Sequence, residues 1–133
     1  MRTDAFITWI HCRDLGSSER FYRDVVGWPL ALEQVDTRVF RVRPGAYLGV
    51  LAREPVAPRG ALILCIVADD VDGWHARLLA AGAPVDGPPR ENPRYGIYHF
   101  FFSDPDGHRL EVQRFLDPRW DRAPAVDAPA GDR

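Results

Sequence analysis

Residues 100–115, with the sequence FFFSDPDGHRLEVQRF, have the pattern of two strands joined by a tight turn. The DPDG segment at 104–107 favours the turn, because proline fixes φ, aspartate side chains bond nearby backbone and glycine accepts a positive φ. After the turn, HRLEVQR alternates polar and apolar side chains around Glu111. This alternation predicts a hairpin whose second strand buries one face and turns its polar side chains to the other.

Glu111 is the residue of this hairpin with the greatest chemical interest. It places a carboxylate in the middle of an aromatic-rich strand pair. A carboxylate in such surroundings can orient a ligand or act as a general base. The plain alternative is a glutamate that faces solvent, because charged side chains mostly lie at the surface.

The composition limits the classes of protein to consider. A chain of 133 residues predicts one domain, or two small halves that share a core. A net charge of −2 without a basic run argues against nucleic-acid binding. No apolar run is long enough to span a bilayer, so we expect no membrane partner. All 17 basic residues are arginine, which excludes a Schiff-base lysine. The first residues lack the apolar core of a signal peptide, so we expect a cytoplasmic protein, with Cys12 and Cys65 as buried free thiols.

The same order of elements occurs twice along the chain. Each half begins with an apolar strand, continues with a helix that ends at a glycine, and closes with about three short strands. The expected helices lie near 17–26 and 71–81, before Gly27 and Gly82. The expected strands are 5–12, 31–33, 37–42 and 47–52 in the first half, and 61–67, 83–85, 96–103 and 108–115 in the second.

These halves define the expected organisation. We expect modules at 5–54 and 60–115, joined by a linker at 54–60, within one domain at 1–115. Neither half is large enough to bury a good core alone, so the two should share one curved sheet with helices on its convex side and a trough on its concave side. The proline-rich tail at 116–133 is expected to be disordered, with Trp120 as a local anchor.

Four motifs in the correct order carry a resemblance to a known family. Residues 14–27 resemble D-L-x-x-S-x-x-F-Y-x-x-x-L-G, residues 70–82 resemble the second helix, Tyr95 and Gly96 resemble a P-x-G entry, and 104–112 resembles D-P-D-G-N-x-L-E. Over residues 5–115 the chain is similar to the vicinal oxygen chelate superfamily, which includes glyoxalase I, bleomycin-resistance proteins and extradiol dioxygenases. The resemblance implies an α+β fold of paired βαβββ modules and a homodimer.

The resemblance also implies four metal-ligand positions, and the sequence departs from them. Family members with a metal have a histidine near the start of each module's first strand and a carboxylate on each module's last strand. Glu111 matches the second carboxylate, but Ile7 and Ile63 hold the histidine positions, and residues 47–51 contain no acid. One carboxylate does not make a metal site, so we expect no metal cofactor at the family position.

Two histidines offer an alternative. His11 shares a strand face with Trp9 by period two, and His99 lies on the strand before the turn. With Glu111 they would give two histidines and one carboxylate at a shifted divalent-metal site. The plain alternative for each histidine is a hydrogen-bonded pocket or core residue. His75 and His108 are expected to be exposed.

Several functions remain open at this point. The first is binding of a small, aromatic or hydrophobic organic molecule in the trough without metal. The expected ligand-binding residues are aromatic or imidazole side chains: Trp9, Tyr47, Tyr98, His99 and Phe101. The alternative is an enzyme of the lyase, isomerase or dioxygenase type, with the shifted metal or with His11 or Glu111 as a metal-free general base. A partner-binding domain without a ligand is the third.

Overall fold

The computed structural model describes residues 1–54, 56 and 61–121. The first half contains β1 (Phe6–Cys12), α1 (Leu15–Arg20), the π-helix η1 (Phe21–Val26), β2 (Leu30–Glu33), β3 (Thr37–Arg43) and β4 (Ala46–Ala52). The second contains β5 (Ile63–Val67), α2 (Val71–Ala80), β6 (Arg90–Asn92), β7 (Ile97–Ser103) and β8 (Arg109–Phe115). This order confirms the α+β class and the paired βαβββ modules. Most of the expected linker and residues 122–133 of the expected tail lie outside the described residues.

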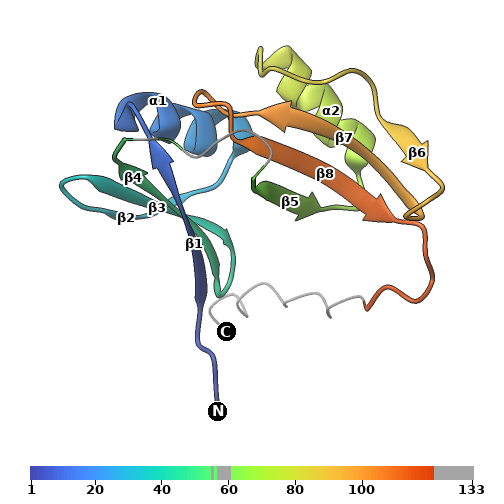
Figure 1. Ribbon diagram of the computed structural model, residues 1–133, viewed down its shortest axis with the longest axis horizontal. Helices are drawn as coiled ribbons and strands as arrows, with labels where there is room; N and C mark the ends of the chain where they lie inside the picture. Colours follow the sequence, from blue (N-terminus) through green and yellow to red (C-terminus); the bar gives the residue numbers. More distant parts are fainter. Residues whose placement is uncertain (55, 57–60, 122–133) are drawn as a thin grey trace, which may run out of the picture.

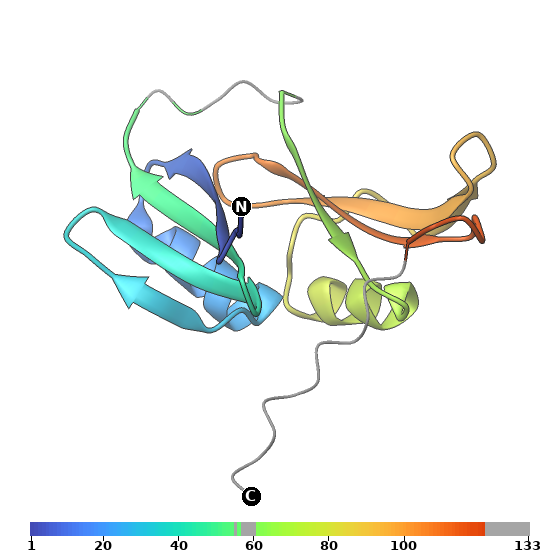
Figure 2. The ribbon, with the colours of Figure 1, turned by 90° about the horizontal axis from the view of Figure 1, so that it is seen from below.

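The strands form two four-stranded mixed sheets, ordered β1-β4-β3-β2 and β5-β8-β7-β6. In each sheet the first strand pairs in parallel with the last, and the other pairs are antiparallel. Figure 1 shows the sheets side by side, and Figure 2 shows both helices on the same side of them. Within the described residues no ladder joins β1 to β5, so the strands form two sheets where one continuous curved sheet was expected.

The first helix is capped at both ends and changes type in the middle. The Asp14 carboxylate accepts hydrogen bonds from Gly16 N at 3.1 Å and Ser17 Oγ at 2.7 Å, which begins α1. The chain then widens into η1, and the Tyr22 carbonyl accepts from the backbone N–H of Gly27 and of Trp28. Gly27 ends the helix with a φ of 93°, as its position in the sequence predicts.

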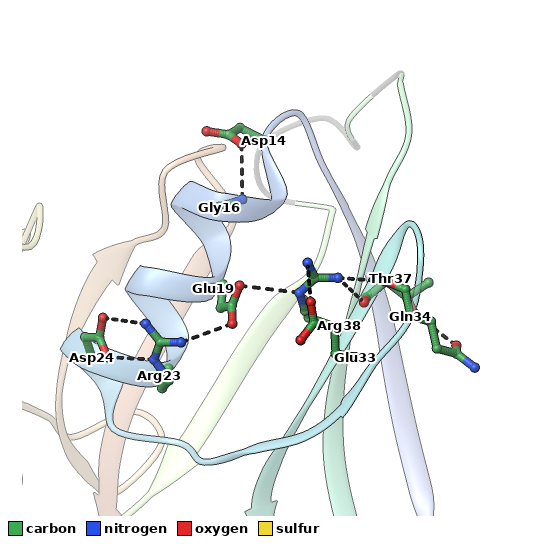
Figure 3. A network of polar contacts seen from close by, with 9 residues as sticks. All are labelled: Asp14, Gly16, Glu19, Arg23, Asp24, Glu33, Gln34, Thr37 and Arg38. Atoms are coloured by element: carbon green, nitrogen blue, oxygen red, sulfur yellow. Dashed lines mark hydrogen bonds and ion pairs between the residues drawn. The ribbon is translucent and has the colours of Figure 1, made fainter.

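Arg38 on β3 ties the first helix to the β2–β3 turn (Figure 3). Its Nε lies 3.4 Å from the Glu19 carboxylate on α1, and its Nη2 lies 3.2 Å from that of Glu33 on β2. Its Nη1 also donates to the carbonyls of Gln34 and Thr37. One guanidinium therefore fixes how α1 lies on the first sheet.

The expected strand at 83–85 is wrong, and β6 forms at Arg90–Asn92, where no strand was expected. Val85 forms an isolated bridge with Phe102, while Ser103 N donates to the carbonyl of Pro84, which itself has no N–H to give. The chain leaves β7 at Gly87 and the two prolines after it, then returns to pair through Arg90–Asn92. The two prolines therefore separate the pairing along this edge of β7 into two short stretches, the Val85 bridge and the β6 ladder.

The two halves share one core, as their small size requires. The rings of Phe21 and Phe102 have centroids 6.2 Å apart, across the boundary between the halves. The 104–108 turn adds polar contacts to the first half. His108 is part of them: it is buried, and its Nε2 lies 2.6 Å from the His11 carbonyl oxygen. The expectation that His108 is exposed is therefore wrong, because its turn is packed against β1.

None of the helices in the described part of the chain has the length and apolar character needed to span a bilayer.

Candidate functional site

Equivalent positions in the two halves carry very different side chains. Trp9 is opposite Gly49 in the β1–β4 register, and Cys65 is opposite Glu111 in the equivalent β5–β8 register. The Trp9 ring lies so close over Gly49 that an added Cβ would collide with it. In the first half a large ring covers this face of the sheet. In the second half the equivalent place holds a thiol and a carboxylate, which leave room.

A cavity of about 660 Å³ opens on the second sheet, on the face opposite α2. Its apolar lining consists of aromatic, aliphatic and proline side chains: Ile63, Pro93, Tyr95, Ile97, Phe101 and Phe115. Its polar lining consists of Arg90, Glu91, Asn92, His99, Glu111 and Gln113. Apolar walls with a few convergent polar groups are typical of sites for small organic ligands.

His99 and Glu111 form the polar centre of this cavity. The His99 Nδ1 lies 2.7 Å from Glu111 Oε2, and the two residues are 6% and 9% exposed. The Phe101 ring meets the imidazole edge to face, with centroids 5.2 Å apart. The structure therefore brings together three of the predicted site residues, from adjacent positions on β7 and β8. An imidazole held by a carboxylate can bind or move a proton at its other nitrogen.

Cys65 is the third member of this polar group. The pKa of its thiol is raised to about 12, first by partial desolvation of the sulfur, although the residue as a whole is exposed, and then by the charge of Glu111 and a hydrogen bond to it. The thiol therefore stays protonated at neutral pH and donates a hydrogen bond to the Glu111 carboxylate. Cys12 is buried as expected, but the expectation of a buried Cys65 is wrong, because its residue is exposed on the face of β5 opposite the core.

Other predicted site residues lie elsewhere. The Tyr98 side chain points to α2, and its hydroxyl donates to Asp72 at 2.5 Å. Trp9 and His11 lie on β1 of the first sheet and do not line the cavity. Tyr47 lines a second, smaller hollow of about 270 Å³ between β1 and β5.

The residues present do not fit the family's metal. The positions expected to carry ligands are Ile7, Ile63, a residue within 47–51 and Glu111, and together they provide one carboxylate. Among the residues that the structure describes, no three His, Cys, Asp or Glu side chains are grouped so that they could hold a metal ion. The shifted site is therefore not assembled, because His11 does not join His99 and Glu111.

Sequence reasoning missed part of the cavity lining. Ile97 and Phe115 face each other across β7 and β8 and lie on the same faces as His99 and Glu111. Strand periodicity alone could have found both. Arg90 could not be found in this way, because no strand was expected at its position. Trp120 behaves as the expected anchor, since its ring stacks on Phe115 with centroids 4.1 Å apart.

Comparisons with known proteins agree on one family. The family model described as "Glyoxalase/Bleomycin resistance protein/Dioxygenase superfamily" matches residues 6–112. No curated protein matched the sequence.

Several solved structures are similar to this chain. TnmS3, an antibiotic binding protein from Streptomyces sp. CB03234, is 32% identical, with 83% of this chain and 93% of that one covered and a TM-score of 0.67. Lactoylglutathione lyase from Agrobacterium tumefaciens is 26% identical, with 85% and 94% covered and a TM-score of 0.69. A glyoxalase-related enzyme from Fulvimarina pelagi, at 22% identity with 89% and 91% covered and a TM-score of 0.72, shares the fold.

Proposed function

Since this chain belongs to the Glyoxalase/Bleomycin resistance protein/Dioxygenase superfamily, we propose that it binds a small aromatic or hydrophobic organic molecule, without the usual metal, in the cavity of the second sheet. The observation that carries the proposal is the cavity itself. Its volume of about 660 Å³ lies within the range of small-molecule sites. Its walls supply apolar burial, and His99, Glu111 and Gln113 converge on it to orient a polar group.

The similarity to an antibiotic binding protein supports the same class of function. That relative is described by what it binds rather than by a reaction. The mismatch between the residues present and a metal site points in the same direction. We therefore propose sequestration of an aromatic compound as the role of the cavity, with a cytoplasmic location as part of the proposal, supported by the two free cysteines.

The internal repeat provides a matched test of this proposal. Ile63 lines the cavity, and Ile7 is its equivalent in the first half, outside the lining. Their exposures of 47% and 41% allow a tryptophan at either place without disturbing the core. Binding of a panel of aromatic antibiotics and simpler aromatic compounds is measured by calorimetry. Ile63→Trp should weaken binding about tenfold or more, as expected for a filled cavity, while Ile7→Trp should leave it unchanged.

Loss of binding in both variants would instead place the ligand across both sheets, where Trp9 and His11 lie. Equal binding by both variants and the wild type would contradict the assignment of this cavity. If no aromatic compound in the panel binds, the chain is better regarded as a partner-binding domain.

One observation favours a second candidate function. The His99–Glu111 pair could support metal-free acid–base chemistry on an enolisable substrate. A compound found to bind in the cavity is then followed by NMR for exchange of its acidic C–H protons with deuterated solvent. Exchange that is catalysed by the wild type and lost in His99→Phe would favour the enzyme over sequestration.

We also propose that the chain acts as a homodimer. Each sheet ends, within the described residues, at an edge strand that pairs on one side, β1 or β5. Large apolar side chains on these strands are exposed, including Phe6, Trp9 and Val67. A second copy would cover this surface and shield both edges.

A further inference from the structure

We propose, on the basis of the binding function above, that Nε2 of His99 accepts a hydrogen bond from an acidic hydroxyl of the ligand, so that the cavity selects phenols and enols over their ethers. Glu111 acts in this proposal as the positioning residue for the imidazole.

The contacts around Glu111 determine which imidazole nitrogen carries the proton. The Glu111 carboxylate has two oxygens that accept hydrogen bonds and, when ionised, none that donate. Its neighbours Cys65 and His99 both direct donors to it, from the thiol and from Nδ1. A neutral imidazole that donates from Nδ1 has its lone pair on Nε2, and it is this neutral form that can accept a hydrogen bond there. The pair therefore holds His99 in the tautomer whose Nε2 is an acceptor.

The Nε2 atom remains available to a ligand. No residue in the described part of the chain forms a hydrogen bond with it. Within that part, Ser18 Oγ is the one side-chain nitrogen or oxygen atom that has neither contact with solvent nor a hydrogen-bond partner. Nε2 is therefore not sealed in the protein, and since His99 lines the cavity, this atom opens into it.

The surroundings of Nε2 favour a hydroxyl on a flat ring. Phe101 lies edge to face with the imidazole, and Ile97 and Phe115 form the adjacent wall. The other charged side chain of the lining on this face is that of Arg90 on β6, which is opposite His99, whereas Glu91 is opposite Tyr98 and belongs to the α2 face of the sheet. A neutral phenol or enol would bury its ring against the apolar wall and donate its one hydroxyl proton in a hydrogen bond to Nε2. A buried acceptor left without a donor costs free energy, so an ether of the same size should bind less well.

The test uses three probes of nearly equal shape: 2-naphthol, 2-methoxynaphthalene and naphthalene. We expect the wild type to bind 2-naphthol about tenfold more tightly than either of the others, the value of one net hydrogen bond. Excited 2-naphthol is a strong acid. In the complex its hydroxyl proton should move to Nε2 of His99 on excitation, so that the bound probe emits as naphtholate and the imidazole becomes imidazolium.

Two variants assign the effect to His99 and its positioning residue. His99→Phe should bind all three probes equally and lose the naphtholate emission of the bound state. Glu111→Gln should reduce both the preference and the emission, because an amide can donate to Nδ1 and so favour the other tautomer. His75→Phe is the matched control: His75 lies on α2, against Phe100 and away from the cavity, so the preference should stay as in the wild type.

The outcomes separate this inference from the proposed function. If the wild type binds none of the probes, the proposed function fails and the inference fails with it. If it binds all three equally, the cavity takes aromatic compounds but the hydroxyl preference is wrong. This comparison needs the wild type alone, so it holds even if His99→Phe does not fold. A preference that persists in a folded His99→Phe would place the acceptor on another residue.

Discussion

At the scale of single residues, the contact between Tyr22 and Asp104 shows how the halves are joined. Tyr22 is fully buried, and its hydroxyl donates to the Asp104 carboxylate at 2.8 Å. The same carboxylate accepts from the backbone N–H of Asp106 and of His108. Burial raises the pKa of Asp104, and the hydrogen bond from Tyr22 is the largest effect that opposes this rise.

Tyr22→Phe should lower the free energy of unfolding by about 1.5–3 kcal/mol at neutral pH, because it removes a donor from a buried carboxylate. The effect should depend on pH. The bond favours the ionised form of Asp104, so its contribution is present above the folded-state pKa of Asp104 and is lost as the pH falls through that value. Urea unfolding at several pH values measures the difference between the two proteins. A difference that grows toward acid pH would contradict this account.

Cys65 provides a second prediction at this scale. Although the residue is exposed, its raised pKa keeps the thiolate, which is the reactive form, scarce at neutral pH. Alkylation by iodoacetamide at pH 8 should therefore be much slower in the folded protein than in denaturant. Glu111→Gln should speed the reaction, because it removes a negative charge that raises the thiol pKa. Cys65→Ser identifies any modification of Cys12. Equal rates in the wild type and Glu111→Gln would show that the carboxylate does not act on the thiol.

At the scale of elements, the contact of β1 with β4 depends on a glycine. Gly49 lies beneath the ring of Trp9, and an alanine there requires the ring to move. Gly49→Ala should destabilise the protein by about 1 kcal/mol, a modest cost because the ring is partly exposed and free to shift. In a Trp9→Ala background the same change should cost nothing. Urea unfolding of the four proteins measures this coupling, and additive effects would count against it.

The elements that the sequence predicted best are those with a strong local signal. The first helix was found from its apolar spacing and from Gly27, although its π-helical second half has no such signal. β7 and β8 were found from their alternation and from the turn between them. β6 was missed because Arg90–Asn92 is short and polar, and its pairing with β7 depends on tertiary contacts rather than on the segment itself.

At the scale of the whole molecule, the exposed apolar strands predict a homodimer. Light scattering at micromolar concentration should give about twice the chain mass of 15.0 kDa. Trp9→Ser should shift the mass toward the monomer, because Trp9 is one of the large exposed side chains on the free edge strand. Trp74→Phe, on α2, serves as a control that should stay dimeric. A wild-type mass near that of one chain would contradict the proposal.

The candidate site could be predicted from the sequence in part. His99, Phe101 and Glu111 lie together because strand periodicity and hairpin pairing are local properties of one segment. Tyr98 does not join them, since a neighbour of His99 on the same strand must point to the opposite face. Trp9 lies on the first sheet and falls outside the cavity. The distance between the two sheets is set by packing between the halves, and no local sequence pattern predicts that packing.

The contacts of the 104–108 turn predict that the chain can be divided into two fragments that associate. Its contacts with the first half, from Asp104 to Tyr22, from His108 to the His11 carbonyl and from Asp106 to Arg13, all join residues far apart in sequence. These contacts form between the folded surfaces of the two halves, and they do not depend on the peptide segment that links the halves. Two fragments, one ending at Glu54 and one starting at Ala61, should therefore stay largely unfolded alone and reconstitute the native circular dichroism spectrum when mixed. The 104–108 turn would then supply the hydrogen bonds that hold the two fragments of the split protein together.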